Sequence, residues 1–360
     1  MRIAVFADKF SGTLTSDEVI GEIKKIFKYN NIKSSFFPVT DGGENSTEIF
    51  KEYGFETQQM SMKQDFSGKW LPVETLKVNK NIYVETSQLI GIKKTNDLSL
   101  DLNTSCLAKI IEDVDILSMG GSRTNDAGIG LLSKMGIDFL NNEEVIEDPK
   151  PKDFKLINNI KINESFKKVN KKVLIDTNIP LLGDNNAFKV FGPQKGLANS
   201  EIKFLEKNVE RILNLLSNEM DSSLDPFKKG TGASGGLSFA LGEVLGCEII
   251  SGPQFFLNET KLLNKINDFE IAILCEGKFD FSSMNGKVLG EILKLHTGKT
   301  YFLGGKFDYN DENIFTDIFE VGNKGMKNSK KALRDSAYIL AKKIGKYDGY
   351  YLSLYKCLCD

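Results

Sequence analysis

The chain has 360 residues, of which 41% are hydrophobic and 27% charged, close to the averages of globular proteins with a buried core. Its 47 basic and 49 acidic residues give a net charge of −2, which excludes a global basic footprint for nucleic acid or an anionic membrane. At about 150 residues per domain, this length predicts two domains.

The rarer residue types and the N-terminus narrow the class of protein further. The apolar run in the opening MRIAVFAD is too short for a signal peptide, and no stretch reaches the roughly 18 apolar residues of a membrane-spanning helix. The five cysteines are scattered apart from a bare C-x-C at Cys357 and Cys359, so reduced thiols in a cytoplasmic protein are expected. With His296 as the only histidine, catalysis is expected from carboxylates, lysines and backbone amides.

The chain opens with a β-α pattern. Residues 2–7 are predicted to form a short buried strand, and residues 15–29 a helix with one apolar face. Thr15, with Glu18 three residues later, matches a capping box. The loop 8–14 therefore leads into a helix N-terminus whose free N–H groups can bind an anion.

A second strand and a hairpin follow. A strand is predicted over 35–39, and the loop 40–44 after it repeats the first pattern. Residues 71–78 and 82–84 are separated by Asn79-Lys80, which indicates a β-hairpin. An antiparallel hairpin in an otherwise β-α chain predicts a mixed sheet.

The rest of the chain continues to alternate between the two patterns, which indicates an α/β protein. Further strands are predicted over 114–119, 173–175, 271–274, 300–303 and 318–321. Further helices are predicted over 127–135, 201–216, 232–245, 287–295 and 328–344. Residues 141–171 are polar with weak periodicity, and they are interpreted as a surface excursion.

Loops rich in Gly and Asp follow many of these strands. In open α/β sheets, ligands bind where such loops gather at the carboxyl ends of the strands. The loops read DKFSGTL at 8–14, DGGE at 41–44, GGSRTND at 120–126, DTNIPLLG at 176–183, FGPQKG at 191–196, and CEGKFD at 275–280 with NGK at 285–287. In this order and spacing they resemble the signature loops of the glycerate kinase family over essentially the whole chain; a chance set of turns is the alternative.

The loop 41–44 carries two glycines between two carboxylates. The backbone amides of Gly42 and Gly43 can approach a substrate or a phosphate closely, while Asp41 or Glu44 binds Mg²⁺ or the substrate hydroxyl. A plain turn with glycines at positive φ is the alternative reading.

The loop 120–126 lies between a predicted buried strand and a predicted helix. Gly120 and Gly121 are typical of an anion cradle in this position, and Arg123 either adds a charge or is merely solvated. The other candidate substrate or phosphate ligands of this loop are Ser122, Thr124, Asn125 and Asp126.

Two further loops offer charged side chains. Asp176 directly follows a predicted strand, a placement typical of carboxylates that hold a metal or accept a proton; an ordinary Asx turn is the alternative. Asn178 in the same loop is a candidate substrate or phosphate ligand. Lys195, next to a glycine, either reaches a transferring phosphoryl group or lies in a solvent-facing turn.

A second charged cluster follows the strand 271–274. Glu276 and Asp280, with Lys287 at a predicted helix start, can coordinate Mg²⁺ and neutralise phosphate charge. The small-residue segment 230–236 opens another predicted helix, and it serves either close packing or ligand approach.

The sequence departs from the family pattern in three places. The family has a serine before and a lysine after the phenylalanine of the first loop, whereas this chain has Lys9 and Ser11, so the two functions are interpreted as exchanged. Residues 100–109 lack the glycine-bearing loop that the family has there. Glu85 keeps the family's glutamate after a strand, but bulkier and more polar residues follow it.

The resemblance implies two α/β domains with a cleft between them. One is flavodoxin/Rossmann-like with a mixed sheet and is formed by residues 1–85 and 270–360, and the other is inserted as residues 86–269. The implied reaction is transfer of the γ-phosphoryl of ATP to D-glycerate, which gives 2-phosphoglycerate with the help of Mg²⁺. A kinase of a related hydroxy acid, a ligand-binding regulator and a metal-dependent phosphatase are the alternatives.

The resemblance also implies roles for the candidate residues. Asp176 accepts a proton or holds metal, Glu276 and Asp280 surround Mg²⁺, and the loops 41–44 and 120–126 bind the substrate carboxylate and phosphate. The lysines expected to contact phosphates are Lys9, Lys195 and Lys287. The implied partners are a small hydroxy acid and a nucleotide, without nucleic acid or membrane, and a homodimer is left open.

Overall fold

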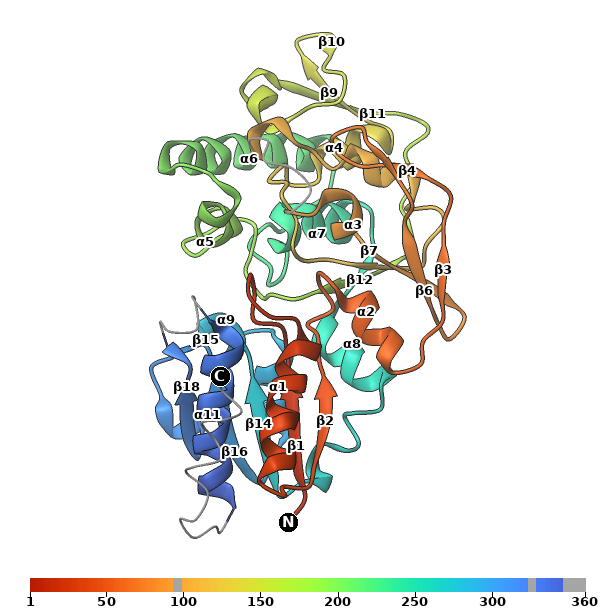
Figure 1. Cartoon of the computed structure of the whole chain (residues 1–360). Coiled ribbons are helices and arrows are strands. Elements are labelled where there is room, and N and C mark those ends of the chain that lie inside the picture. Colours follow the sequence, from red (N-terminus) through yellow and green to blue (C-terminus); the bar gives the residue numbers. More distant parts are fainter. Residues whose placement is uncertain (93–98, 323–327, 346–360) are drawn as a thin grey trace. The chain divides into compact units, whose positions relative to one another are not determined.

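The computed structural model describes residues 1–92, 99–322 and 328–345 (Figure 1). The chain divides into two compact units: unit 1 comprises Met1–Thr40 and Thr260–Asp360, and unit 2 comprises Asp41–Glu259. This division differs from the boundary expected after residue 85, because residues 41–85 pack with unit 2. The C-x-C of Cys357 and Cys359 lies outside the described residues.

Unit 1 is built on a parallel five-stranded sheet. Its order is β18(Asp317–Glu320), β16(Lys299–Gly304), β14(Ile271–Cys275), β1(Ile3–Ala7) and β2(Ser34–Pro38), and every neighbouring pair is parallel. When these five strands are numbered in chain order, their order in the sheet, counted from the β2 edge, is 2-1-3-4-5, as in flavodoxin-like folds. The order reverses between β1 and β14, so the loops after these two strands lie where such folds bind ligands.

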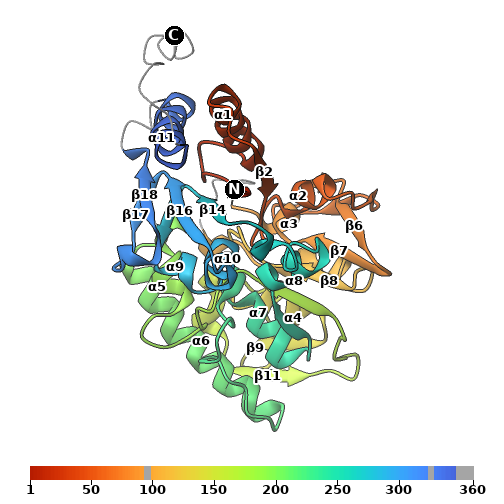
Figure 2. The ribbon, with the colours of Figure 1, turned by 90° about the horizontal axis from the view of Figure 1, so that it is seen from below.

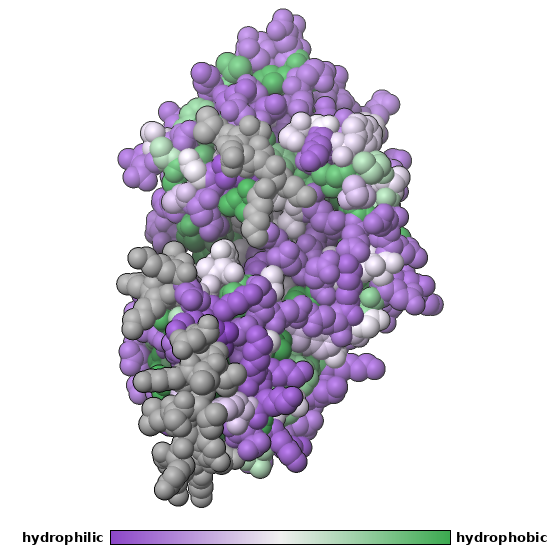
Figure 3. Space-filling model, viewed as in Figure 1, coloured by the Kyte–Doolittle hydropathy of each residue, from purple (hydrophilic) through white to green (hydrophobic). Residues whose placement is uncertain are grey.

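Helices cover both faces of this sheet. Helices α1(Ser16–Tyr29) and α11(Ser329–Ile344) lie side by side on one face, and α10(Val288–Leu295) lies on the other (Figure 2). Thr15 and Glu18 form the predicted capping box of α1. The buried face of α1 includes Val19 and Ile23, whereas its outer side is largely hydrophilic (Figure 3).

Unit 2 contains a mixed six-stranded sheet. Its order is β13(Glu248–Ser251), β12(Lys172–Ile175), β8(Ile116–Ser118), β7(Asn81–Glu85), β6(Glu74–Val78) and β3(Thr57–Gln59). The first four strands are parallel, and β6 pairs antiparallel with both β7 and β3. The predicted hairpin is confirmed and belongs to unit 2. The mixed sheet is expected in the flavodoxin/Rossmann-like domain, but the sheet of unit 1 is entirely parallel and the mixed sheet is that of unit 2, because the hairpin joins β8 and not β1.

The segment 141–171 is not only a surface excursion. Strands β9(Ile137–Asn141), β10(Glu144–Val145) and β11(Asn159–Ile162) form an antiparallel sheet of their own. Phe154 and Ile160 are buried in the core of unit 2, and Arg211 donates a hydrogen bond of 2.6 Å to the Phe154 carbonyl. The core contacts of this segment come from residues distant in sequence, so local periodicity did not reveal them.

The helix predicted over 232–245 is interrupted. It consists of η5(Ala233–Gly236), α7(Leu237–Phe239) and the π-helical η6(Ala240–Val244). Ser234 and Gly235 have φ of 51° and 67°, so the chain turns through the left-handed region before the α-helix begins. The glycines of the segment 230–236 permit this turn.

The other predicted elements lie close to their expected places, and shorter ones complete the fold. The remaining α-helices are α2(Ser46–Glu52), α3(Ser87–Ile90), α4(Ile129–Lys134), α5(Ala187–Phe191), α6(Asn199–Glu219), α8(Gly252–Glu259) and α9(Phe281–Met284). The remaining strands are β4(Lys63–Gln64), β5(Trp70–Leu71), β15(Lys278–Asp280) and β17(Lys306–Asp308). The 3₁₀ turns are η1(Ser99–Asp101), η2(Ser105–Lys109), η3(Pro151–Leu156), η4(Pro193–Lys195), η7(Ile266–Asp268) and η8(Glu312–Ile314). None of the helices in the described part of the chain has the length and apolar composition needed to cross a bilayer.

Candidate active site

The carboxyl edge of the parallel strands in unit 2 gathers the predicted loops. Strands β7, β8, β12 and β13 are neighbours in the sheet. Strand β7 ends at Glu85, and the other three strands lead into Gly120, Asp176 and Gly252 respectively. Loops at this edge of a parallel sheet are the usual ligand sites of α/β folds. The sequence of the loops and the topology of the sheet therefore select the same edge.

Glycines allow the loops 41–44 and 120–126 to meet Asp176. A Cβ on Gly120, whose φ is 126°, would lie 2.6 Å from Asp176 Oδ2 and 3.0 Å from Gly43 Cα. A Cβ on Gly121 would lie 3.0 Å from Glu44 Cβ. A side chain at either position would force its neighbours to shift, and the φ of 126° at Gly120 and 66° at Gly121 favours glycine as well. The two glycines therefore allow the three loops to pack closely.

The backbone of the loop 120–126 is held by the surrounding protein. The Gly120 N–H donates to Ser234 Oγ at 3.0 Å, and the Arg123 N–H donates to the Ile90 carbonyl at 2.8 Å. A Cβ on Gly235 would lie 2.1 Å from the Thr124 carbonyl oxygen, so the segment 230–236 packs directly against this loop. The amides of Gly120 and Arg123 serve internal bonds, and an anion cradle would have to use other amides of the loop.

Lys195 lies inside the protein, not in a solvent-facing turn. Its side chain is buried, and Nζ donates to Ser122 Oγ at 3.2 Å, to the Thr124 carbonyl at 2.8 Å and to Asn125 Oδ1 at 3.3 Å. An ammonium group has three donors, and these acceptors match all three. Burial lowers the pKa of Lys195 to about 7, although the charges of Asp126 and Asp176 act in the opposite direction.

Asp126 is a structural anchor. It is fully buried, and Oδ2 accepts bonds from Thr104 N–H at 2.8 Å, Thr104 Oγ1 at 2.7 Å and Gly130 N–H at 3.1 Å. Burial raises the pKa of its carboxyl group against the effect of these hydrogen bonds. Thr104 belongs to the segment 100–109 that departs from the family pattern, so this segment supports the 120–126 loop from behind.

The other predicted residues of unit 2 are placed as follows. Asp176 is half-buried at the end of β12, whereas Asn178 in the same loop is exposed. Asn125 is buried and donates from Nδ2 to Ser99 Oγ at 2.5 Å. Gly42 is buried, and a Cβ on it would lie 3.2 Å from Gly252 Cα. Asp41 and Glu44 are half-buried.

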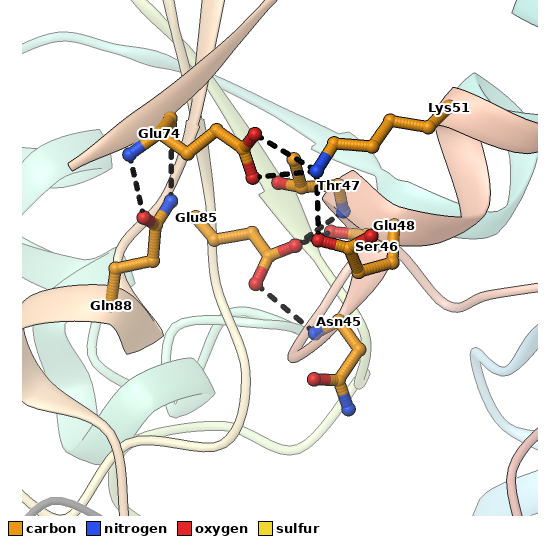
Figure 4. A network of polar contacts seen from close by, with 8 residues as sticks. All are labelled: Asn45, Ser46, Thr47, Glu48, Lys51, Glu74, Glu85 and Gln88. Carbon is orange, nitrogen blue, oxygen red and sulfur yellow. Dashed lines mark hydrogen bonds and ion pairs between the residues drawn. The ribbon is translucent and has the colours of Figure 1, made fainter. Parts of the chain in front are cut away.

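Sequence reasoning did not include Glu85 and Ser234 among the site residues. Glu85 is buried and accepts hydrogen bonds from the N-terminus of α2, directly after the loop 41–44 (Figure 4). The family's glutamate after a strand was a signal for Glu85. Ser234 was hidden within a small-residue segment whose role only the packing reveals.

Unit 1 brings a second set of predicted residues to its own sheet edge. The Asp8 N–H donates to the Cys275 carbonyl at 2.9 Å, and a Cβ on Gly277 would lie 3.1 Å from Phe10 Cα. The first loop, which carries half-buried Lys9, therefore packs on the loop after β14. Both loops lie at the reversal of strand order between β1 and β14.

The carboxylates of this second set are engaged with lysines and a helix cap. Lys287 Nζ lies 3.9 Å from Glu276 Oε2, and Glu276 is buried. Asp280 Oδ1 accepts from the backbone N–H and the hydroxyl of Ser282 at 2.9 and 2.6 Å, and Oδ2 pairs with Lys278 at 3.0 Å. Burial opposes the charge on Asp280, but the bonds from Ser282 and Lys278 prevail and lower its pKa.

The Mg²⁺ ligands expected from the sequence, Glu276 and Asp280, both follow β14 of unit 1. Within residues 1–92, 99–322 and 328–345, no group of three or more His, Cys, Asp or Glu side chains is arranged to hold a metal ion. Asp280 Oδ1 serves the cap of α9 and Oδ2 pairs with Lys278, and the expected role of Asp280 as a Mg²⁺ ligand stays a prediction.

The fold and the site define the class of this protein as an α/β protein with polar loops gathered at the carboxyl edges of its sheets. It belongs to the glycerate kinase family, because the sequence model of the Glycerate kinase family matches residues 3–346, nearly the whole chain. The family and the relatives named below make it a kinase.

Individual relatives agree with this assignment. Glycerate 2-kinase of Escherichia coli (strain K12) is 26% identical over 306 residues, which is 80% of each chain. Glycerate kinase of Halalkalibacterium halodurans is 27% identical over 303 residues, 79% of each chain. A solved structure from Salmonella typhimurium LT2, named as a glycerate kinase 2, superposes with a TM-score of 0.67 at 21% identity over 96% of this chain and 98% of that chain. This last likeness concerns the fold.

Proposed function

We propose that the protein phosphorylates D-glycerate with ATP and releases 2-phosphoglycerate and ADP. Family membership supports the substrate, and the name of the Escherichia coli relative, Glycerate 2-kinase, supports the position of the phosphoryl group. The observation that carries the proposal is the meeting of Asp176 with Gly43 and Gly120 at the sheet edge of unit 2.

In the proposed reaction the substrate hydroxyl oxygen attacks the γ-phosphorus of ATP. A new phosphorus–oxygen bond forms, the bond to the oxygen bridging the β- and γ-phosphates breaks, and ADP leaves with that bonding pair. The hydroxyl proton passes to the carboxylate of Asp176, which is half-buried at the end of β12. The protein's task is mainly to position the reactants and stabilise charge.

The loops around Asp176 would position the acid. The loop 41–44 offers Asp41 and Glu44 for hydroxyl groups of the substrate, and the loop 120–126 offers backbone amides beyond those engaged by Ser234 and Ile90. Lys195 is assigned a different role from the phosphate contact expected from sequence, because its three donors hold Ser122, Thr124 and Asn125. It fixes the shape of the loop and contributes positive potential.

Mg²⁺ is proposed to accompany the nucleotide and to neutralise phosphate charge. The carboxylates that would hold it are Glu276 and Asp280 of unit 1, as the family resemblance implies, and Asp176 is left to accept the proton. Lys9 and Lys287 of unit 1 are proposed to contact phosphates. Lys9 lies in the loop that follows β1, at the reversal of strand order, and Lys287 is the N-cap residue of α10.

A coupled assay of ADP release tests this function. D-glycerate, tartronate and other small hydroxy acids are offered with MgATP, and NMR of the product distinguishes 2-phosphoglycerate from 3-phosphoglycerate. Turnover of D-glycerate to the 2-phospho product supports the proposal. Turnover of another acid only would identify a related kinase, and tight binding of acids without turnover would identify a regulator.

The compartment proposed is the cytoplasm. Three of the five cysteines, Cys106, Cys247 and Cys275, are buried free thiols in the structure, as a reducing environment would keep them. Burial raises the pKa of the Cys247 thiol to about 11, which makes it unreactive.

A further inference from the structure

We propose that Glu85 is a positioning residue of the active site, which fixes the loop 41–44 by holding the N-terminus of the helix behind it. The proposal rests on the proposed function, because it takes this loop to contact the acid substrate. Glu85 itself does not touch the reacting atoms in this proposal. It acts through the backbone of Asn45 and Thr47.

Four donors converge on the Glu85 carboxylate, and three of the donor residues, Asn45, Ser46 and Thr47, are drawn in Figure 4. Oε2 accepts from the Asn45 N–H at 3.1 Å and from Ser87 Oγ at 3.2 Å. Oε1 accepts from Ser46 Oγ at 3.0 Å and from the Thr47 N–H. Only an ionised carboxylate accepts from all four without presenting a donor of its own.

The helix α2 depends on this carboxylate for its cap. Asn45 stands at the N-cap position with φ of 69°, and its side chain makes no capping bond. The free N–H groups of a helix N-terminus need acceptors, and negative charge there is favourable. Glu85, which is 40 residues away in the sequence, provides both from the end of β7.

The cap is coupled directly to the loop that carries the candidate site residues. Asn45 follows Glu44, and the Ser46 N–H donates to the Gly43 carbonyl at 3.1 Å. Gly43 in turn lies against Gly120 and Asp176. A shift of Asn45 and Ser46 therefore moves the glycine that meets the proposed proton acceptor.

Buried aromatic groups make the anchor rigid. Tyr83 precedes Glu85 on the same face of β7, is fully buried, and its hydroxyl contacts Ser46 Oγ. Phe50 of α2 packs edge-on against the Tyr83 ring with centroids 5.5 Å apart. The carboxylate therefore has little freedom to follow a moving helix.

The other end of α2 supplies a matched control. Lys51 pairs with Glu74 at 2.8 Å and with Glu48 at 2.8 Å (Figure 4). Glu74 lies on β6, next to β7, and it contacts the last turn of α2. Loss of the Glu74 carboxylate removes a strand-to-helix contact of the same kind without touching the helix N-terminus.

The test compares Glu85→Gln, Glu85→Ala and Glu74→Gln in the full chain. The side-chain nitrogen of glutamine donates hydrogen bonds and cannot accept them. In Glu85→Gln this nitrogen replaces one carboxylate oxygen, so two of the four donors lose their acceptor. We expect kcat/KM for D-glycerate to fall about 10-fold in Glu85→Gln and about 100-fold in Glu85→Ala, because small misplacements of a positioned substrate have effects of this size. The KM for ATP should stay within about twofold, and Glu74→Gln should match the wild type.

Amide hydrogen exchange of a peptide covering residues 41–47 gives a readout that does not depend on turnover. Exchange should be faster in Glu85→Ala than in the wild type and unchanged in Glu74→Gln. Wild-type kcat/KM in Glu85→Ala would overturn the proposal. So would equal losses in Glu85→Ala and Glu74→Gln, or a fall in activity that merely follows global unfolding in both Glu85 variants.

Failure of the proposed function is distinguishable from failure of this inference. If the wild type does not turn over D-glycerate, calorimetric binding of the acid replaces the assay. Weaker binding together with faster exchange in Glu85→Ala then supports the positioning role. Unchanged binding or unchanged exchange refutes it.

Discussion

At the residue scale, Asp176 carries the greatest weight of the proposed chemistry. Its carboxylate lies against two loops that the sequence marks by paired glycines. We expect Asp176→Asn to lower kcat by about 10³-fold, within the usual range for loss of a general base, with little change in melting temperature. Steady-state kinetics and thermal unfolding measure the two effects.

The neighbouring Asp184 is the control for this substitution. It is exposed and lies in the segment that follows the Asp176 loop, so Asp184→Asn should keep wild-type kcat. A large fall in the melting temperature of Asp176→Asn would instead assign Asp176 to an Asx turn that the fold requires. Unchanged kcat would remove it from the catalytic proposal.

Lys195 is the second residue whose substitution should lower the activity strongly. Its ammonium group satisfies Ser122, Thr124 and Asn125, whereas the neutral amine has only two donors for these three acceptors. Because its pKa is lowered to about 7, kcat/KM should fall as the pH rises through about 7. We expect Lys195→Met to reduce activity strongly and to abolish this inflection in a pH–rate profile.

An exposed lysine nearby provides the comparison. Lys189 pairs with Glu206 at 3.1 Å at the surface of unit 2. Lys189→Met should therefore retain both the activity and the inflection. Persistence of the inflection in Lys195→Met would assign it to another group and leave Lys195 with a packing role only.

The sequence located the site residues unevenly for a physical reason. Asp176, Gly43 and Gly120 were predictable, because each belongs to a loop with its own composition after a strand of recognisable pattern. Glu85 and Ser234 act through hydrogen bonds to residues 40 and 114 positions away, which no local pattern contains. Lys195 was identified, but its burial and its bonds to Ser122 and Asn125 follow from tertiary packing.

At the element scale, the interrupted helix at 233–244 serves the loop 120–126. Gly235 has φ of 67°, and a Cβ there would lie 2.1 Å from the Thr124 carbonyl oxygen. We expect Gly235→Ala to destabilise the protein by about 3 kcal/mol, since left-handed strain of about 1 kcal/mol adds to overpacking. It should also lower kcat/KM, because the clash pushes on the loop 120–126, which we propose to bind the substrate.

Gly54→Ala separates these two contributions. Gly54 lies in unit 2 with φ of 85°, and no atom outside its immediate neighbours lies within 4 Å of the added Cβ. Only the cost of the backbone conformation, about 1 kcal/mol, is expected there, with unchanged activity. Equal unfolding free energies for the two variants would show that the contact with Thr124 yields without cost.

The helix predicted over 232–245 illustrates how local rules reach their limit. The apolar residues from Leu237 onward fit a helix, and that part is helical. The glycines before it were compatible with a helix start, with close packing or with ligand approach. The structure favours packing, because Gly232 and Gly236 as well as Gly235 would each place a Cβ within 3 Å of neighbouring atoms.

At the scale of the whole molecule, both ends of the chain contribute to unit 1. The resemblance predicted that arrangement, but the expected boundary after residue 85 separated β7 from its partner β8. Strand β7 pairs in parallel with β8, and β6 pairs with β7, so the hairpin belongs to the sheet of unit 2. A hairpin's local pattern indicates its own pairing but not the sheet that it joins.

The two ends of the chain are tied together by a buried ion pair. Glu22 of α1 accepts from Arg334 of α11 at 2.9 Å and from Lys25 at 2.8 Å, and only 7% of its side chain is exposed. Burial opposes the charge, but the bonds from Lys25 and Arg334 prevail and lower the pKa of Glu22. A carboxyl group with a lowered pKa stabilises the fold above its unfolded pKa, and this contribution is lost as the pH falls through the folded pKa.

The effect of pH on Glu22→Gln follows from this sign. At pH 7 the variant should be less stable than the wild type by about 2 kcal/mol, the size expected for hydrogen bonds to a charged group. Below about pH 4.5 the difference should shrink, because the unfolded wild type binds a proton at Glu22 before the folded protein does, and the contribution is lost as the pH falls through the lowered folded pKa. Urea unfolding at a series of pH values measures this difference in stability.

Lys330→Gln is the matched control, because its exposed pair with Glu18 also joins α1 to α11 and should contribute little. A difference for Glu22→Gln that stayed constant down to pH 3 would mean that packing, not charge, joins the two ends of the chain.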